Sequence, residues 1–257
     1  MTDYLEAFGE LVGIVARLRA PDGCPWDREQ THQSLREGLL EECYEVLGAL
    51  DEMDAAKLRE ELGDLLLHVV FQAQIAGEAG EFTLAEVISG INRKLISRHP
   101  HVFAAKKVKD AGEVVLHWEK LKKAERGEAV SALDSVPEQM PSLAYGQSVQ
   151  ARAARLGFDW EDTGGVIEKL VEEAGEFQDA PDTASRQREF GDLLFTMVNL
   201  GRRLGIDSET ALREANRRFY RRFKRMEELT GERGRSFGEM NPREQNVLWE
   251  EAKRTVG

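Results

Sequence analysis

The chain has 257 residues, of which 41% are hydrophobic and 32% charged, so it is long enough to bury one large core or two modest ones and too apolar for a disordered protein. Its 23 glycines and 7 prolines are too few for a collagen-like or turn-rich all-β chain. The net charge of −12 repels polyanions, so we expect neither stable nucleic-acid binding nor a membrane surface as partner.

The cellular location is predicted from the same composition. Two cysteines, Cys24 and Cys43, are too few for a disulfide framework. Uncharged stretches are shorter than the roughly 20 residues that a membrane-spanning helix needs. The first residues lack the basic and apolar segments of a secretion signal. These features together favour the cytoplasm.

The predicted elements are helices throughout. Apolar residues recur at helical spacing in segments such as 39–50 and 62–70, and no stretch alternates as a strand does. Breaks rich in Gly and Pro fall at 20–26, 77–81, 99–100, 126–141 and 157–165. The sequence therefore predicts an all-α fold.

The helical pattern occurs twice along the chain. Glu41-Glu42-x-x-Glu45 recurs as Glu172-Glu173-x-x-Glu176, and Glu61-x-x-Asp64 recurs in the same order as Glu189-x-x-Asp192. Three fewer residues separate the two motifs in the second copy, which predicts a connecting loop three residues shorter. We expect two tandem helical modules, 1–125 and 142–257, joined by a linker at 126–141.

Each acidic set is more than a solvated charged face. A single Glu-Glu-x-x-Glu usually is such a face, but like charges at i and i+4 repel and these acids adjoin apolar residues, where unpaired anions are costly. A divalent cation would reconcile them, and the oxygen-only ligands suit Mg²⁺ or Mn²⁺ better than zinc or copper. The predicted metal ligands are Glu41, Glu42, Glu45, Glu61 and Asp64 in the first copy and Glu172, Glu173, Glu176, Glu189 and Asp192 in the second.

Basic and aromatic side chains follow each acidic set. Arginine at helical spacing suits phosphate oxygens, and a Trp with a Lys four residues later suits a base and a phosphate. The alternatives are a solvated basic stripe and a Trp packed on its own helix. Candidate nucleotide-binding residues are Lys94, Arg98, Trp118 and Lys122, then Arg218, Arg222, Trp249 and Lys253. The segments Gly23-Cys24-Pro25-Trp26-Asp27 and Gly157-Phe158-Asp159-Trp160 are either turns that seat an aromatic ring or binding loops.

The ordered set of motifs resembles the MazG family of nucleoside triphosphate pyrophosphohydrolases over nearly the whole chain. The resemblance is carried by the motifs above together with Gln30-Thr31-His32, Leu40, Leu62-Gly63, Leu65-Leu66 and Arg98-His99-Pro100-His101-Val102-Phe103. It implies tandem all-α modules, a four-helix arrangement completed by homodimerisation, and Mg²⁺-dependent hydrolysis of NTPs and dNTPs to monophosphate and pyrophosphate. Its nucleotide contacts fall on Arg218, Arg222, Trp249 and Lys253, and Arg218 stands where the family often has Lys.

The hypothesis for the reaction is attack on the α-phosphorus by a water that the metal activates. Glu42, Glu45, Glu173 and Glu176 are the candidate catalytic residues, with Glu45 or Glu176 as the general base. The alternative is a non-catalytic nucleotide or metal sensor that recruits a protein partner. A purely structural helical bundle is the third possibility.

Overall fold

The structure, a computed structural model, describes residues 3–104, 108–110, 112–114, 121 and 131–256. The chain divides into two compact units, Met1–Trp118 and Glu119–Gly257, and each is described by itself. Every regular element in the described ranges is a helix, which confirms the all-α prediction. None of these helices is both long and apolar enough to cross a membrane.

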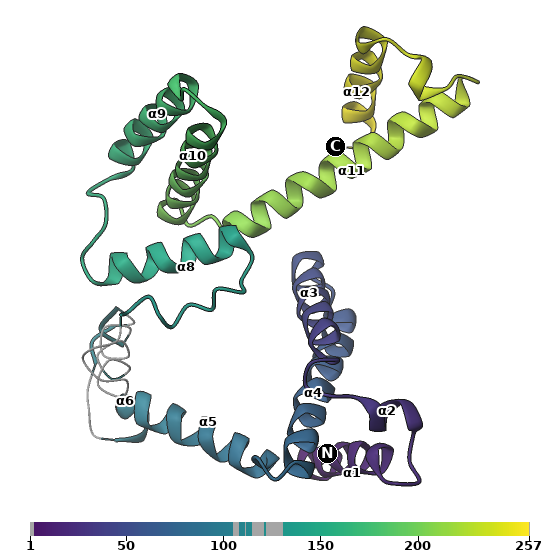
Figure 1. The fold of residues 1–257 in the computed structure, drawn as a ribbon, viewed down its shortest axis with the longest axis vertical. Coiled ribbons are helices and arrows are strands. Elements are labelled where there is room, and N and C mark those ends of the chain that lie inside the picture. The colour runs from purple at the N-terminus through teal and green to yellow at the C-terminus, as the bar shows by residue number, and fades with distance from the viewer. Residues whose placement is uncertain (1–2, 105–107, 111, 115–120, 122–130, 257) are drawn as a thin grey trace. The chain divides into compact units, whose positions relative to one another are not determined.

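The first unit is built on an antiparallel pair of helices. Its elements are α1 (Tyr4–Arg19), α2 (Pro25–Glu29), α3 (Arg36–Glu52), α4 (Ala55–Glu78), α5 (Leu84–Arg98) and α6 (Pro100–Phe103). Helices α3 and α4 lie side by side, and α1 packs against the end of α4 remote from the α3–α4 turn (Figure 1). A core of Val15, Leu35, Val70 and Phe71 fixes that packing.

Local capping explains where the helices of the first unit begin. The carboxylate of Asp54 accepts hydrogen bonds from the amides of Ala56 and Lys57 and so starts α4. Thr83 and Glu86 form a reciprocal capping box at the start of α5. Helix α3 ends at Met53, which adopts a left-handed backbone with φ of 54° and allows the two-residue turn into α4.

Arg19 ties the N-terminal part of the first unit together. Its side chain is 8% exposed and forms a salt bridge with Glu78 of α4 at 2.7 Å. The same guanidinium donates hydrogen bonds to the carbonyls of Asp27 and Gln30, at 2.6 and 3.1 Å. It therefore fixes the segment around α2 to both α1 and α4.

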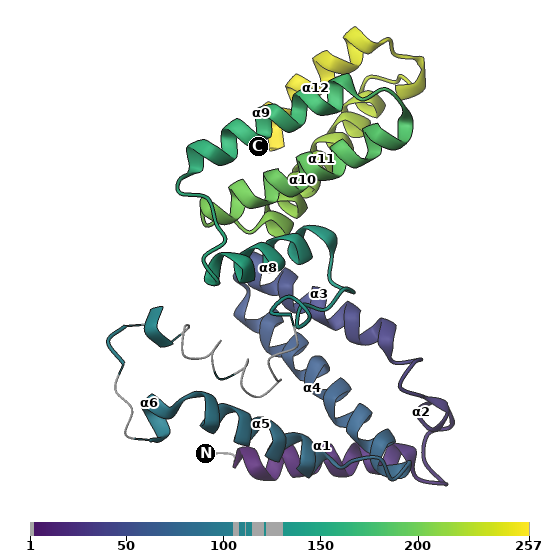
Figure 2. The same cartoon turned by 60° about the vertical axis from the view of Figure 1, so that its left-hand side comes forward.

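The second unit repeats the helix pair and adds three further α-helices and a short 3₁₀ helix in its described part. Its elements are α8 (Ser142–Arg155), α9 (Thr163–Asp179), α10 (Thr183–Arg203), α11 (Ser208–Glu232), the short 3₁₀ helix η1 (Phe237–Glu239) and α12 (Pro242–Val256). Helices α9 and α10 form the antiparallel pair, and α8 packs on α10 (Figures 1 and 2). Helix α12 folds back on the part of α11 farther from α8 (Figure 1), around a core of Met226, Leu229, Met240, Leu248 and Ala252.

The spacing difference between the copies arises in a helix, and the prediction of a shorter loop is wrong. Helix α3 continues to Glu52 after Glu45, whereas α9 ends at Asp179, soon after Glu176. The connection 180–182 is one residue longer than 53–54. Removal of about one helical turn keeps the remaining carboxylates on the same face, since a turn has 3.6 residues.

Candidate metal centres

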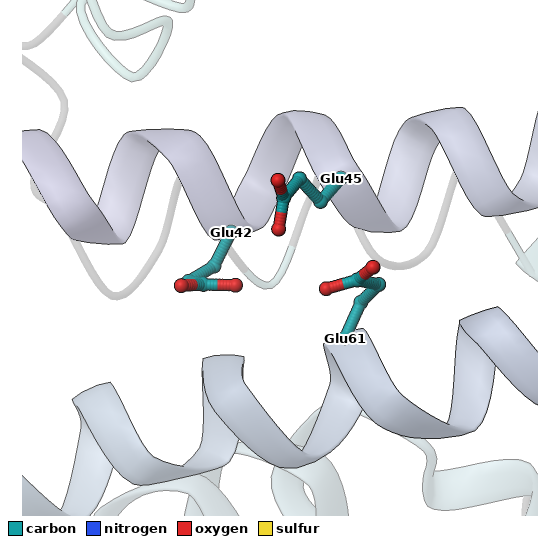
Figure 3. A group of neighbouring side chains, drawn as sticks. All are labelled: Glu42, Glu45 and Glu61. Carbon is teal, nitrogen blue, oxygen red and sulfur yellow. The ribbon is translucent and has the colours of Figure 1, made fainter.

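Three carboxylates of the first unit converge between α3 and α4. Glu42 and Glu45 extend from α3 and Glu61 from α4 into the space between the helices (Figure 3). One oxygen of each lies within 4.8 Å of the others. We call this group the first acidic triad. The other predicted ligands of this copy, Glu41 and Asp64, lie outside it.

Three carboxylates of the second unit also converge. Glu173 of α9 meets Glu189 and Asp192 of α10, with one oxygen of each again within 4.8 Å of the others. We call this group the second acidic triad. The predicted ligands Glu172 and Glu176 are solvent-exposed on α9 and lie outside it.

The charges of the first acidic triad are mutually unfavourable. Burial, and then the neighbouring charges of Asp64 and Glu45, raise the pKa of Glu42. Burial, and then Glu45, raise the pKa of Glu61. Glu42 Oε2 and His68 Nδ1 are buried and find no hydrogen-bond partner among the residues that the structure describes. A hard divalent cation fits this oxygen-rich set because it would pair the orphaned oxygen and offset the repulsion.

The second acidic triad has a protein cation beside it. Lys169 Nζ lies 2.8 Å from Glu173 Oε1 and 2.9 Å from Glu172 Oε1. Hydrogen bonds to these two carboxylates raise the pKa of Lys169. Glu173 is 5% exposed, and its buried Oε2 has no hydrogen-bond partner in the described part of the chain. Lys169 thus pairs with only one of the two oxygens of Glu173.

The first unit lacks a lysine at the matching position. Lys169 precedes Glu173 by one turn, and the residue one turn before Glu42 is Gly38. A Cβ built on Gly38 would lie 3.0 Å from Cε1 of His68. His68 therefore lies against Gly38, the residue that stands at the position of Lys169 in the first copy.

A cavity of about 770 Å³ opens beside the second acidic triad. It lies between α8, α9, α10 and the segment that precedes α9, and Lys169, Glu173 and Asp192 form part of its wall. Phe158, Trp160 and Phe195 are among its apolar lining residues. This cavity could not be predicted from the sequence, because the contribution of α8 to its wall depends on tertiary packing.

Asp159 fixes the aromatic segment at the edge of the cavity. Arg202 and Arg203 of α10 form salt bridges with its carboxylate at 2.5 and 3.2 Å, and the hydrogen bond from Arg202 is the main reason that the pKa of Asp159 is lowered. Arg203 also donates to the carbonyl of Trp160 at 2.7 Å. The segment Gly157–Trp160 is therefore an anchored part of the cavity wall.

The basic and aromatic candidates of the second unit lie on a different part of it. The Arg222 guanidinium is 5.7 Å from the centre of the Trp249 ring, which also contacts Phe219. Lys253 pairs with Glu250. These residues, with the exposed Arg218, belong to the arm formed by α11 and α12, which Figure 1 shows apart from α9.

The corresponding candidates of the first unit are only partly described. Lys94 and Arg98 are one turn apart on α5, outside the first acidic triad. Trp118 and Lys122 lie outside the described residues. Neither Lys94 nor Arg98 is among the residues that line the cavity between α1, α4 and the start of α5.

Comparisons with known proteins agree on one family. A family model described as the MazG nucleotide pyrophosphohydrolase domain matches residues 30–103. The chain is 47% identical to the nucleoside triphosphate pyrophosphohydrolase/pyrophosphatase MazG of Thermotoga maritima, over 96% of this chain and 95% of that protein. It is 43% identical to the nucleoside triphosphate pyrophosphohydrolase of Escherichia coli K12, over 95% of this chain and 96% of that protein. The uncharacterized protein YabN of Bacillus subtilis is 46% identical over 96% of this chain and 52% of its own length.

Proposed function

This chain belongs to the MazG family of nucleotide pyrophosphohydrolases, and from that premise we propose where and how its hydrolysis takes place. It is a nucleoside triphosphate pyrophosphohydrolase, as its relatives matched over nearly their full lengths are named. Such an enzyme cleaves the bond between the α- and β-phosphates and releases a nucleoside monophosphate and pyrophosphate.

The second unit is proposed as the principal hydrolytic site. The observation that carries this proposal is the orphaned Glu173 Oε2 beside a cavity large enough for a nucleoside. Glu173, Glu189 and Asp192 would hold Mg²⁺, with Mn²⁺ as a substitute, and Glu172 and Glu176 border them on α9. The first acidic triad, with Glu41 and Asp64 beside it, is proposed as a second metal site.

The chain's own residues supply positioning and proton transfer. When bound, the metal would neutralise phosphate charge and lower the pKa of water. Glu176 is exposed on the same helix as Glu173 and is proposed to accept the proton of the attacking water, a role that Glu45 would take in the first unit. Lys169 lies where it pairs with negative charge next to Glu173, so it stabilises the charged leaving group.

A homodimer is proposed to complete the nucleotide site. Arg222, Trp249 and Lys253 lie on the α11–α12 arm rather than beside the second acidic triad (Figure 1). Phe219 and Tyr220 on this arm are 59% and 69% exposed, and large exposed apolar side chains favour an interface between chains. The arm of one chain is proposed to cover the triad of its partner. Sedimentation equilibrium at micromolar protein tests this, and a monomer contradicts it.

A product assay tests the reaction. The protein is incubated with each NTP and Mg²⁺, and the products are separated by ion-exchange chromatography. The expected products are the monophosphate and pyrophosphate, and they should disappear with excess EDTA. A diphosphate with orthophosphate contradicts attack at the α-phosphorus. Tight NTP binding without any turnover would instead favour the non-catalytic sensor.

A further inference from the structure

Gln150 of α8 is a buried residue in the wall of the cavity of the second unit. Its side-chain Nε2 donates a hydrogen bond to the carbonyl of Phe195 at 2.8 Å, which fixes the amide orientation. The residue is 7% exposed, and its Oε1 has no hydrogen-bond partner among the described residues. A buried acceptor without a partner is costly, so this oxygen is suited to an N–H group that enters the cavity.

The walls around Gln150 suit a flat aromatic ring. Phe158 and Trp160 stand on the anchored segment at one side, and Phe195 of α10 lies at another. Val149 and Ala153 of α8 complete an apolar surface on which a heterocycle can pack. A cavity of about 770 Å³ is in the range of sites for small organic ligands.

The same cavity also has charged lining residues. Lys169, Glu173 and Asp192 line it, so a ligand whose ring lies near Gln150 can extend its charged tail toward the lysine and the metal ligands. A nucleotide has this order of parts: a base at one end and phosphates at the other. The two copies differ at the position of this glutamine: Gln150 stands ten positions before Trp160, whereas the residue ten positions before Trp26 is Ala16.

We propose that this cavity receives the nucleobase and that Gln150 Oε1 accepts a hydrogen bond from the exocyclic amino group of the base. The proposal rests on the proposed hydrolysis in the second unit and adds a residue that sets base preference. An exocyclic amino group projects beyond its ring, so it reaches an acceptor on the cavity wall before the ring atoms do. Substrates whose base lacks that group leave the buried oxygen unpaired and are selected against.

Paired substrates isolate this hydrogen bond. The full-length protein is assayed with three pairs that differ in the amino group: ATP and purine ribonucleoside triphosphate, CTP and the 2-pyrimidinone ribonucleoside triphosphate, and GTP and ITP. In at least one pair the wild type should show a kcat/KM about 10-fold or more higher for the amino-bearing substrate. Gln150→Leu should bring the ratio of that pair close to one, because no acceptor remains to be satisfied.

The control variant is Gln147→Leu. Gln147 is one turn earlier on α8, bonds Ile206 and Ser208, and does not line the cavity, so its substitution should leave the ratio unchanged. Circular dichroism confirms that each variant is folded. Equal loss of kcat/KM for both members of every pair in Gln150→Leu indicates a structural role and overturns the proposal, as does a wild type that discriminates within no pair.

The remaining outcomes separate this proposal from the function on which it rests. A wild type that hydrolyses none of the six substrates contradicts the proposed function itself. Normal hydrolysis with an unchanged ratio in Gln150→Leu overturns only the base site. A ratio that changes in Trp249→Ala but not in Gln150→Leu places the base on the α11–α12 arm and also overturns it.

Discussion

The two acidic hairpins share their motif but differ in how the charge of the motif is balanced. In the first unit, Glu42 and Glu61 have raised pKa values, and the position one turn before Glu42 is a glycine. In the second unit, Lys169 occupies that position and pairs with Glu173. The repulsion among the carboxylates is therefore met mainly by raised pKa values in one unit and by pairing with a lysine in the other.

The surroundings of the hairpins differ as well. The second acidic triad forms part of the wall of a large cavity. The smaller cavity of the first unit, about 310 Å³, lies between α1, α4 and the start of α5 and has no residue of the first triad in its lining. A repeated motif thus predicts that carboxylates converge in both copies but not which of the two triads borders a large cavity.

The largest expected effect is the loss of hydrolysis when the second triad is neutralised. Glu173→Gln should lower kcat by about 100-fold or more, since a lost metal ligand removes stabilisation of several kcal/mol from the transition state. Glu42→Gln, the matching change in the first unit, should lower it less than about 3-fold. Steady-state assays of both variants measure the contrast. Equal losses would remove the distinction between the units.

Removing Lys169 tests whether this lysine accounts for the difference in charge balance between the two triads. In a Glu42→Gln background, Lys169→Met should tighten Mg²⁺ binding without nucleotide by about 10-fold, because a cation no longer competes for Glu173. Isothermal titration calorimetry measures the affinity. The reverse transplant, Gly38→Lys with His68→Thr in a Glu173→Gln background, should weaken Mg²⁺ binding in the first unit. Unchanged affinities would show that Lys169 does not compete with the ion.

Displacing the Trp160 ring at the edge of the cavity should have a smaller effect, on substrate binding. A Cβ on Gly165 would lie 2.9 Å from the Trp160 ring, so Gly165→Ala must displace that ring from the cavity edge. We expect KM for the preferred NTP to rise about 3-fold with little change in kcat, since ground-state and transition-state contacts are lost together. Gly175→Ala on the same helix, where a Cβ meets nothing within 4 Å, is the control. A change in kcat alone would contradict this role.

The smallest effect is on the stability of the metal-free protein. A carboxyl group whose folded pKa is raised holds more protons in the folded state than in the unfolded state, so stability falls as pH rises from about 4.5 through the raised pKa. Glu42→Gln removes the carboxyl group that causes this fall in stability. It should raise Tm by about 2 to 5 °C at pH 8 in EDTA, and by less at pH 4.5. Thermal unfolding followed by circular dichroism measures both. A lower Tm at pH 8 would mean that Glu42 stabilises the apo fold.

The helices and the acidic hairpins were predictable because both depend on local spacing. Apolar residues at helical intervals indicated the elements, and the convergence of Glu42, Glu45 and Glu61 follows from the i, i+3 spacing of the first two on one helix that faces a second. The position of the lost turn in α9 was not predictable, because a sequence offset does not say whether a loop or a helix is shortened.

The remaining features of the second site arise from long-range packing. Gln150 is one polar residue on an amphipathic helix, and only the approach of α8 to α10 places it at a cavity. The role of Lys169 left a signal in the sequence, since a lysine one turn before Glu173 lies on the same helical face. The first copy has Gly38 at that position, so the sequence itself contains the difference in charge between the two copies.

The separation of the α11–α12 arm from the second acidic triad has a genetic consequence for the proposed dimer. Glu173→Gln and Arg222→Ala should each inactivate a dimer in which both chains carry the same substitution. In a dimer of one chain of each kind, every site combines the triad of one chain with the arm of the other. One site then carries both substitutions and the other carries neither, so co-expression should recover a fraction of wild-type turnover. Two alleles of this gene would then complement each other, although neither encodes a working enzyme.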